Sequence, residues 1–270
     1  MNAHTAVDTP LLVTRPEPGV AQITLNRPRS RNALSIAMMT ALGGAFAELG
    51  ADKSIKAIVL AANGPAFSAG HDLKELTAHR ADPDGGRAFY SATMTQCAAL
   101  MQAIVACEKP VIAAVEGIAT AAGCQLVATC DLAVAADTAT FATPGVNIGL
   151  FCSTPMVALS RNVPRKRAME MLLLGEAMGA REASEYGLVN RVVAREQVRE
   201  AALQFSRTIA SKSQGTVAIG KRAFYEQTEM PLSEAYTHAS AVMVHNMMTA
   251  DAQEGICAFL EKREPKWQGC

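Results

Sequence analysis

The sequence lacks a charge imbalance and any hydrophobic run long enough to cross a membrane. Its 270 residues contain 25 Lys and Arg and 25 Asp and Glu, so the formal net charge is zero. Balanced charge gives no support for binding to nucleic acid or to a membrane surface. No apolar run reaches about 18 residues, the length that a membrane-spanning helix requires. We therefore expect neither a nucleic-acid partner nor a membrane partner.

Cysteine pairs and targeting signals are also missing. The seven cysteines are scattered, odd in number and without CxxC spacing, which indicates free thiols in a reducing compartment rather than a disulfide framework or a zinc site. Residues 1–12 have neither the charged start and apolar run of a signal peptide nor the Arg- and Ser-rich composition of a transit peptide. The sequence thus predicts a soluble, cytoplasmic protein without a metal.

The common nucleotide and hydrolase motifs are absent as well. There is no GxGxxG after a strand, no GxxxxGKS or GxxxxGKT and no HExxH. There is also no GxSxG, because Ala66 stands two residues before Ser68. These absences count against nucleotide hydrolysis, hydride transfer at a Rossmann site, zinc hydrolysis and serine hydrolysis. No cofactor is predicted.

Hydrophobic patterning, in contrast, predicts an α/β fold. Half of the residues are hydrophobic, and the short segments 20–25, 56–61, 111–115 and 132–136 are expected to form strands. They alternate with helical patterns at 34–49 and 94–105, as is typical of an α/β domain with covered sheets. After residue 196 the strand signals stop. We therefore expect a core domain over 1–196 and a helical region over 197–270.

Two segments place small residues at a junction between strand and helix. FSAGHDL (67–73) and GIATAAG (117–123) each follow a strand and begin a helix. Free N–H groups and the helix dipole favour negative charge at such a place. Together, the two segments suggest a pocket with two donors for a developing oxyanion. For either segment alone, close packing of helix on strand is the alternative interpretation.

Longer motifs resemble the enoyl-CoA hydratase/isomerase (crotonase) superfamily. The resemblance covers nearly the whole chain and rests on LNRPRSRNAL (25–34), GPAFSAGHDLKEL (64–76), KPVIAAVEGIATAAGCQLVATCDLAVA (109–135), FATPGVNIGL (141–150) and EGICAFLEKREPKW (254–267). It implies a spiral of ββα units with a C-terminal helical trimerisation region. It also implies a homotrimer or hexamer, and an acyl-CoA thioester as substrate or ligand.

The resemblance further implies the residues of the site. The oxyanion donors are the main-chain N–H groups of His71 and Ala122, whose side chains matter little to that role. The two glutamates that hydratases use map to Gln125 and Gly145, neither of which can exchange a proton. General acid–base catalysis contributes roughly 10²–10⁴-fold, so efficient hydration is not expected. Gln125 is then either an amide that orients a water or an acyl oxygen, or a core amide satisfied by backbone.

Other side chains in the matched motifs have two interpretations each. The His71 imidazole titrates near neutrality, and a decarboxylase branch of the family has histidine there, but the ring alternatively packs locally. Cys152 lies where family members place variable catalytic groups, although a buried thiol is usually inert. Asp72 is expected to cap a helix, and Asp131 to tie down a turn.

The resemblance also implies five contacts with CoA, in which Phe259 and Lys262 meet the adenine and the phosphate. Arg27, Ala69 and Lys74 belong to the N-terminal motifs, and Phe259 and Lys262 belong to the C-terminal AFLEKR motif, which often acts from a neighbouring subunit. A cation on a long stem suits a phosphate in water. The alternative for each lysine is a solvated surface side chain.

Three functions remain open from the sequence. The first is an acyl-CoA enzyme that uses the oxyanion hole for decarboxylation, isomerisation or thioester cleavage. The second is a weak enoyl-CoA hydratase of fatty-acid metabolism, and the third is a non-catalytic acyl-CoA binder. The missing glutamates favour the first over the second.

Overall fold

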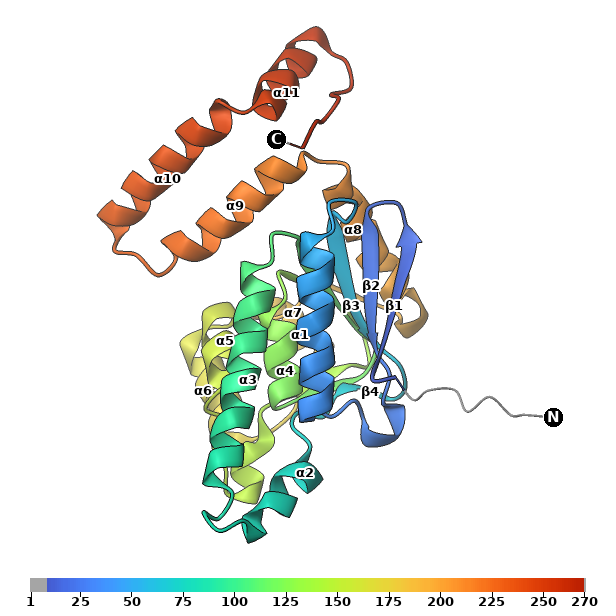
Figure 1. The fold of residues 1–270 in the computed structure, drawn as a ribbon, viewed down its shortest axis with the longest axis vertical. Helices are drawn as coiled ribbons and strands as arrows, with labels where there is room; N and C mark the ends of the chain where they lie inside the picture. Colours follow the sequence, from blue (N-terminus) through green and yellow to red (C-terminus); the bar gives the residue numbers. More distant parts are fainter. Residues whose placement is uncertain (1–8, 270) are drawn as a thin grey trace, which may run out of the picture.

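The computed structural model describes residues 9–269, which form a two-sheet core and a helical arm (Figure 1). The larger sheet has the strand order β1-β2-β3-β5-β7-β10, and the smaller has the order β4-β6-β8-β9. Pairing is parallel except between β1 and β2 and between β8 and β9. The strands are β1 (Leu11–Glu17), β2 (Val20–Leu25), β3 (Ala57–Ala62), β4 (Ala66–Ser68), β5 (Val111–Val115), β6 (Ile118–Thr120), β7 (Leu132–Ala136), β8 (Thr140–Ala142), β9 (Met178–Gly179) and β10 (Arg191–Val193).

Three successive strand pairs each contribute their first strand to the larger sheet and their second strand to the smaller sheet. β3, β5 and β7 are neighbours in the larger sheet, and the strand that follows each of them, β4, β6 or β8, joins the smaller sheet. A helical segment follows every pair. All residues of β3 and β5 are buried, because strands of a parallel sheet are covered on both faces and are therefore uniformly apolar. The expected α/β class and the spiral of ββα units are thus confirmed.

The helices divide between the core and the arm. Those of the core are α1 (Ile36–Ala51), α2 (Leu73–Ala78), α3 (Arg87–Ala106), α4 (Ala122–Thr129), α5 (Pro155–Asn162), α6 (Arg165–Leu174), α7 (Ala180–Glu185) and α8 (Val198–Ala210). The arm consists of α9 (Gln214–Gln227), α10 (Leu232–Met247) and α11 (Ala250–Glu261). No helix in the described part of the chain is long and apolar enough to cross a membrane.

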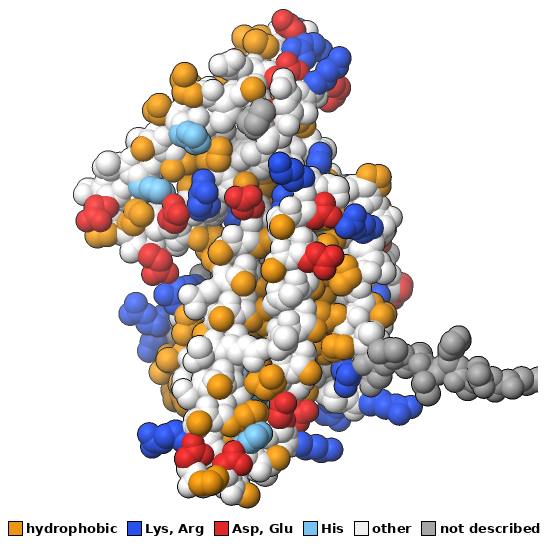
Figure 2. Space-filling model, in the orientation of Figure 1, with side chains coloured by type: hydrophobic (Ala, Val, Ile, Leu, Met, Phe, Trp, Pro, Cys, Tyr) orange, Lys and Arg blue, Asp and Glu red, His pale blue; other side chains and the backbone are white. Residues whose placement is uncertain are grey.

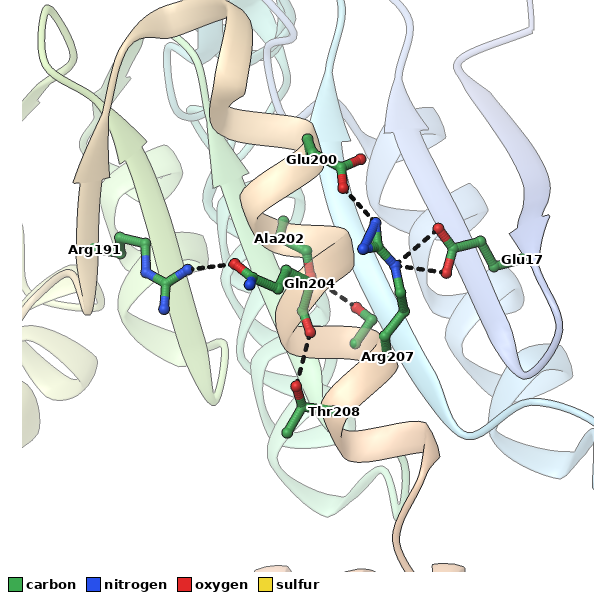
Figure 3. A network of polar contacts seen from close by, with 8 residues as sticks. Glu17, Arg191, Glu200, Ala202, Gln204, Arg207 and Thr208 are labelled. Atoms are coloured by element: carbon green, nitrogen blue, oxygen red, sulfur yellow. Dashed lines mark hydrogen bonds and ion pairs between the residues drawn. The ribbon is translucent and has the colours of Figure 1, made fainter.

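Helix α8 spans the larger sheet and is fixed to both of its edges. It packs on β3, β5 and β7. Arg207 of α8 donates to both carboxylate oxygens of Glu17, at the end of edge strand β1, at 3.1 and 2.9 Å. At the other edge, Arg191 of β10 donates to Gln204 of α8 at 2.8 Å (Figure 3). α8 follows residue 196 yet lies on the core sheet, and the two-domain division at that residue stays a prediction.

The arm projects away from the sheets and joins the core through a buried ion pair. Lys221 of α9 donates to Asp131 Oδ2 at 2.7 Å, and Tyr225 of α9 donates to Asp131 Oδ1 at 2.9 Å. The side chains of Lys221 and Asp131 are only 7% and 15% exposed. Asp131 Oδ2 also accepts from the N–H of Val111 at 2.7 Å, at the start of β5. Asp131 was expected to tie down the turn that follows it, but the structure shows its carboxylate bonded instead to the start of β5 and to α9 of the arm.

Most of the predicted elements appear within two residues of their expected ends. β2, β5 and β7 have the predicted bounds, β3 is displaced by one residue, and α1 by two. α3 begins seven residues earlier than residue 94, because residues 87–93 continue its helical turns. The strands β4, β6, β8, β9 and β10 were not predicted, since periodicity cannot be recognised over two or three residues. The edge strand β1 was also missed, because it is almost entirely exposed and shows no alternation of buried and exposed side chains. The prediction that residues 1–12 are not a targeting segment concerns mainly residues 1–8, which lie outside the part of the chain that the structure describes.

Candidate active site

Asn32 fastens the loop after β2 to the loop after β3. It is fully buried in a left-handed conformation with φ of 53°. Its side-chain nitrogen donates to the carbonyls of Asn63 and Ala66 at 2.9 and 2.8 Å, and its oxygen accepts from the N–H of Arg27 at 2.8 Å. One amide thus satisfies three main-chain groups that would otherwise be orphaned. The motif around Arg27 therefore serves the shape of this loop, whatever else it binds.

The same two loops continue side by side as far as His71. The N–H of Ala69 donates to the carbonyl of Arg31 at 3.0 Å, and the N–H of Leu34 donates to the carbonyl of Gly70 at 2.7 Å. Leu34 and His71 form a parallel bridge. Asp72 then caps α2, its side chain accepting from two N–H groups of the first turn, so the expected cap is confirmed. His71 is therefore held between a bridge and a helix start.

The loop 117–123 packs directly against the segment 65–70, and the contacts are between main-chain atoms. β4 pairs with β6 in parallel. A Cβ on Gly117 would collide with the carbonyl of Pro65, and one on Gly123 with the carbonyl of Ser68. A Cβ on Gly70, which has φ of +83°, would lie 3.1 Å from the nitrogen of Ala122. The two predicted donor loops are thus brought together, with His71 and Ala122 on facing segments.

Neither of the two predicted N–H donors is hydrogen-bonded within the described residues. Ala122 is the first residue of α4, where an N–H has no partner within the helix. Among residues 9–269, no hydrogen bond from the N–H of His71 or Ala122 is formed. Ala121 before it adopts φ of 50° and ψ of −121°, which is strained for a residue with a Cβ. The surrounding contacts therefore impose the direction of the peptide that carries the Ala122 N–H. The oxyanion role itself stays a prediction.

The ring of His71 packs locally. Nδ1 lies 3.3 Å from the carbonyl oxygen of Leu34, which makes Nδ1 the protonated nitrogen. Nε2 is sealed from solvent and has no partner among the described residues. Burial lowers the pKa of His71, while the Leu34 carbonyl and the Glu75 carboxylate oppose this shift. The ring therefore bonds the Leu34 carbonyl just before α1, and is neutral at physiological pH.

Gln125 lies in the first turn of α4 and is 5% exposed. Its side-chain oxygen has one long contact, 4.0 Å from Sγ of Cys97 in α3. Its side-chain nitrogen makes no hydrogen bond to any residue of the described chain. The interpretation as a core amide satisfied by backbone is therefore not what the structure shows.

Gly145 lies in the turn Pro144–Ile148 after β8 and has no free volume beside it. A Cβ there would stand 2.7 Å from the carbonyl oxygen of Leu150 and 2.9 Å from Sγ of Cys152. The N–H of Leu150 also donates to the carbonyl of Gly145 at 2.9 Å. Burial raises the pKa of the Cys152 thiol, and the Gly145 main chain opposes this shift. The thiol is thus protonated and packed against the Gly145 turn, and a catalytic role for Cys152 stays a prediction.

The predicted CoA residues fall into two groups. Arg27, Ala69 and Lys74 lie on the loops and helix that surround the His71 bridge. Phe259 and Lys262 belong to the end of α11, at the opposite end of the molecule from α2 (Figure 1). Phe259 is 82% exposed. One protomer therefore does not bring the two groups together.

Several residues that shape the site were not singled out from the sequence. Asn32 and Leu150 lie within the matched motifs LNRPRSRNAL and FATPGVNIGL, whereas Cys97 lies outside all of the matched motifs. Their roles depend on contacts that appear only in the folded chain. No group of three or more His, Cys, Asp or Glu residues in the described chain could hold a metal. The six described cysteines are free.

The fold and these loops define an α/β protein of the crotonase type. A model of the family "Enoyl-CoA hydratase/isomerase" matches residues 15–270, and the chain belongs to that family. It is 49% identical over 257 residues, 95% of this chain and 84% of the relative, to enoyl-CoA hydratase domain-containing protein 3, mitochondrial, of Rattus norvegicus.

Solved structures agree with this assignment. An enoyl-CoA hydratase of Mycobacterium smegmatis is 53% identical with a TM-score of 0.91, covering 96% of this chain and 98% of that one. Human enoyl Coenzyme A hydratase domain-containing protein 3 is 46% identical with a TM-score of 0.91, covering 96% and 100%.

The expected cytoplasmic location is contradicted by these relatives. The rat, mouse and human proteins all carry "mitochondrial" in their names. The expectation relied on the composition of the first residues, and the match to the rat protein leaves 16% of that relative outside it (100% less the 84% matched). The absence of a leader pattern in those residues was therefore the wrong basis for a location.

Proposed function

We propose that this chain is an acyl-CoA enzyme that stabilises a thioester enolate with the main-chain N–H groups of His71 and Ala122. The observation that carries the proposal is that these two amides lie on loops in main-chain contact and are used by no other group of the described residues. Donors fixed in a buried site stabilise developing negative charge without reorganisation, by roughly 2.7–4 kcal/mol each.

The chemistry that suits this site needs no protein acid or base to form the enolate. Gln125 and Gly145 cannot titrate, Nδ1 of His71 donates to the Leu34 carbonyl, and the Cys152 thiol is protonated. Loss of CO₂ from a carboxylated acyl group breaks the bond between the α-carbon and the carboxylate and leaves an enolate without removal of a proton. The α-carbon of the enolate then takes up one proton, which solvent water supplies. Hydration and double-bond isomerisation both require proton transfer. Decarboxylation is therefore favoured among the three reactions, and thioester cleavage and isomerisation rank below it.

We further propose that the arm assembles the chain into a homotrimer or a hexamer. Hydrophobic side chains are exposed along α10 and α11 (Figure 2), among them Tyr236, Val244, Met248 and Leu260 at 62% or more. An apolar hollow of about 620 Å³ lies between the three arm helices. Contiguous exposed apolar surface of this kind marks a protein interface. In such an assembly Phe259 and Lys262 would reach the CoA of a neighbouring protomer.

The oxyanion donors are tested by removing one of them. Ala122→Pro deletes the N–H at the first position of α4, where proline costs no intrahelical bond. Ala122→Gly keeps the N–H and is the matched control. Titration with acetoacetyl-CoA, followed by the ultraviolet absorbance of its enolate, reports enolate stabilisation. Calorimetry with acetyl-CoA and free CoA reports binding.

We expect Ala122→Pro to bind the enolate roughly 10²–10³-fold more weakly than Ala122→Gly, with free CoA binding unchanged. Thermal unfolding of both variants verifies that α4 remains folded. Equal enolate affinities in two folded variants would refute the oxyanion role. No binding of any CoA thioester by the wild-type protein at millimolar ligand would refute the acyl-CoA assignment as a whole.

A further inference from the structure

The first turn of α8 carries an arginine that contacts the ends of two strands of the larger sheet. Nε of Arg199 donates to Oε1 of Glu116 at 2.5 Å. Its Nη2 donates to the carbonyl oxygen of Ala62 at 2.9 Å and to Oδ1 of Asn63 at 3.2 Å. Ala62 is the last residue of β3, and Glu116 directly follows the neighbouring strand β5. One guanidinium therefore joins the chain where it leaves both strands.

The helix by itself gives no reason for an arginine at this position. A cation in the first turn of a helix is disfavoured by the helix dipole. The backbone around Arg199 is nevertheless fixed, because α8 packs on β3, β5 and β7 and the adjacent Val198 is buried. The planar guanidinium of arginine reaches several acceptors at once, which the ammonium of lysine does not do in the same way. The contacts of Arg199 therefore fix the two strand ends relative to each other.

These strand ends are the starting points of the two segments that carry the proposed oxyanion donors. One segment runs from Asn63 to His71, and the other runs from Glu116 to Ala122. An oxyanion site needs both N–H groups at hydrogen-bond distance from one oxygen atom. The separation of the two segments therefore determines whether both donors reach the same oxygen.

The segments stay in main-chain contact all the way from Arg199 to the donors. A Cβ on Gly117, the residue after Glu116, would collide with the carbonyl of Pro65. β4 and β6 then pair in parallel, and a Cβ on Gly123 would collide with the carbonyl of Ser68. Close-packed groups of this kind transmit a displacement because no free volume absorbs it. A shift at the start of one segment therefore reaches its donor.

We infer that Arg199 is a positioning residue that sets the relative placement of the His71 and Ala122 N–H groups. Its bonds are to the starts of the two donor segments, so it acts on the donors through the chain and not on the substrate. This inference rests on the proposed function, since it concerns the two donors that the proposed function assigns.

The experiment uses titration with acetoacetyl-CoA, followed by the absorbance of its enolate, and calorimetry with free CoA. Arg199→Met removes the guanidinium, and Arg199→Lys keeps the charge without the planar fork. Arg207→Met is the matched control, because it removes an arginine–glutamate pair from the same helix at edge strand β1 (Figure 3). Glu116→Gln removes the charge of the partner. Thermal unfolding verifies that each variant is folded.

Arg199→Met should bind the enolate roughly 5- to 150-fold more weakly than wild type, the range of coupling between two separate sites. Arg199→Lys and Glu116→Gln should show smaller losses, and free CoA should bind equally to all variants. Arg207→Met should bind the enolate like wild type. If Arg199→Met does not fold, the same comparison with Arg199→Lys and Glu116→Gln decides.

Two results would overturn the inference while the proposed function stands. In the first, folded Arg199 and Glu116 variants bind the enolate as tightly as wild type. In the second, Arg207→Met loses as much enolate affinity as Arg199→Met, which would mean that any loosening of α8 has the same effect. If the wild-type protein does not bind the enolate more tightly than free CoA, the proposed function fails and this inference fails with it.

Discussion

At the scale of single residues, the site combines main-chain groups, which do not depend on the identity of the side chain, with side-chain groups, which do. His71 and Ala122 offer N–H groups whose presence does not depend on their side chains. Gln125 and Gly145 are the residues predicted to replace the two hydratase glutamates, and the structure shows that these two positions differ in the space beside them. Glutamate is isosteric with Gln125, whereas the structure leaves no room for any side chain at Gly145. Substitution of these two residues alone therefore cannot restore the acid and the base of a hydratase.

Restoring both glutamates should fail at the second position. A Cβ at residue 145 would be 2.7 Å from the Leu150 carbonyl oxygen, a backbone atom that cannot rotate away. Gly145→Ala should therefore already destabilise the protein by about 1–3 kcal/mol, as overpacking does. The double variant Gln125→Glu with Gly145→Glu should hydrate crotonyl-CoA no faster than wild type.

Urea unfolding measures the first effect and loss of crotonyl-CoA absorbance the second, with Gln125→Glu alone as the sterically neutral control. A stable double variant that hydrates crotonyl-CoA at least 10²-fold faster than wild type, the lower bound for a general acid or base, would show that the Leu150 turn is movable.

His71 should make stability depend on pH. Burial lowers its pKa in the folded state below the ordinary 6.5. Above that value the ring is neutral in both states. As the pH falls below it, the unfolded chain takes up a proton that the folded chain refuses. Stability therefore falls until the pH passes the lowered folded pKa, by about 1.4 kcal/mol for each unit of lowering.

Unfolding free energies between about pH 5 and 8, where histidine titrates, test this prediction. His71→Asn retains a donor to the Leu34 carbonyl without a titrating ring, so its stability should fall less on acidification. Parallel pH profiles for wild type and variant would mean that His71 has an ordinary pKa in the folded protein.

At the scale of elements, the main strands and helices were predictable because their signal is periodic and local. β5 and β7 are uninterrupted apolar runs, and α1 repeats its buried side chains every three or four residues. The site was predictable only as motifs. The contact of Cys97 with Gln125 joins residues 28 positions apart. The contact of the Leu150 carbonyl with Gly145 depends on the conformation of the turn between them. Neither leaves a pattern in the sequence.

The junction of α9 with the core should be the costliest polar contact to break. Lys221 donates to Asp131 and to the carbonyls of Ile104 and Lys109, at 2.7, 3.2 and 3.3 Å. Lys221→Met would leave Asp131 buried without its cation, which typically costs about 3–5 kcal/mol. Tyr225→Phe removes one bond to a charged group and should cost about 1.5–3 kcal/mol.

Urea unfolding with Arg222→Met as a control measures these costs, since Arg222 is the exposed neighbour on α9 and its substitution should stay within about 0.5 kcal/mol. If Lys221→Met unfolds like the control, the ion pair contributes nothing to the attachment of the arm.

At the scale of the whole molecule, the arm should determine the assembly. Val244 and Met247 are 62% and 56% exposed on α10. Changing both to Glu places charge in the proposed interface, where burial of unpaired charge is unfavourable. Light scattering should show the wild type as a trimer or hexamer and the double variant as a 28.5 kDa monomer. Ser240→Glu, on the same helix but polar already, should leave the assembly intact, and a wild-type monomer at micromolar concentration would contradict the proposal.

The close approach of the two donor loops limits which mutations the lineage can accept. At Gly117 and Gly123 every replacement adds a carbon where the carbonyls of Pro65 and Ser68 already lie, so any missense change there disturbs the scaffold. At His71 and Ala122 a change of side chain leaves the N–H in place. Mutational drift can therefore change the side chains around the proposed site while the two main-chain N–H groups are inherited unchanged.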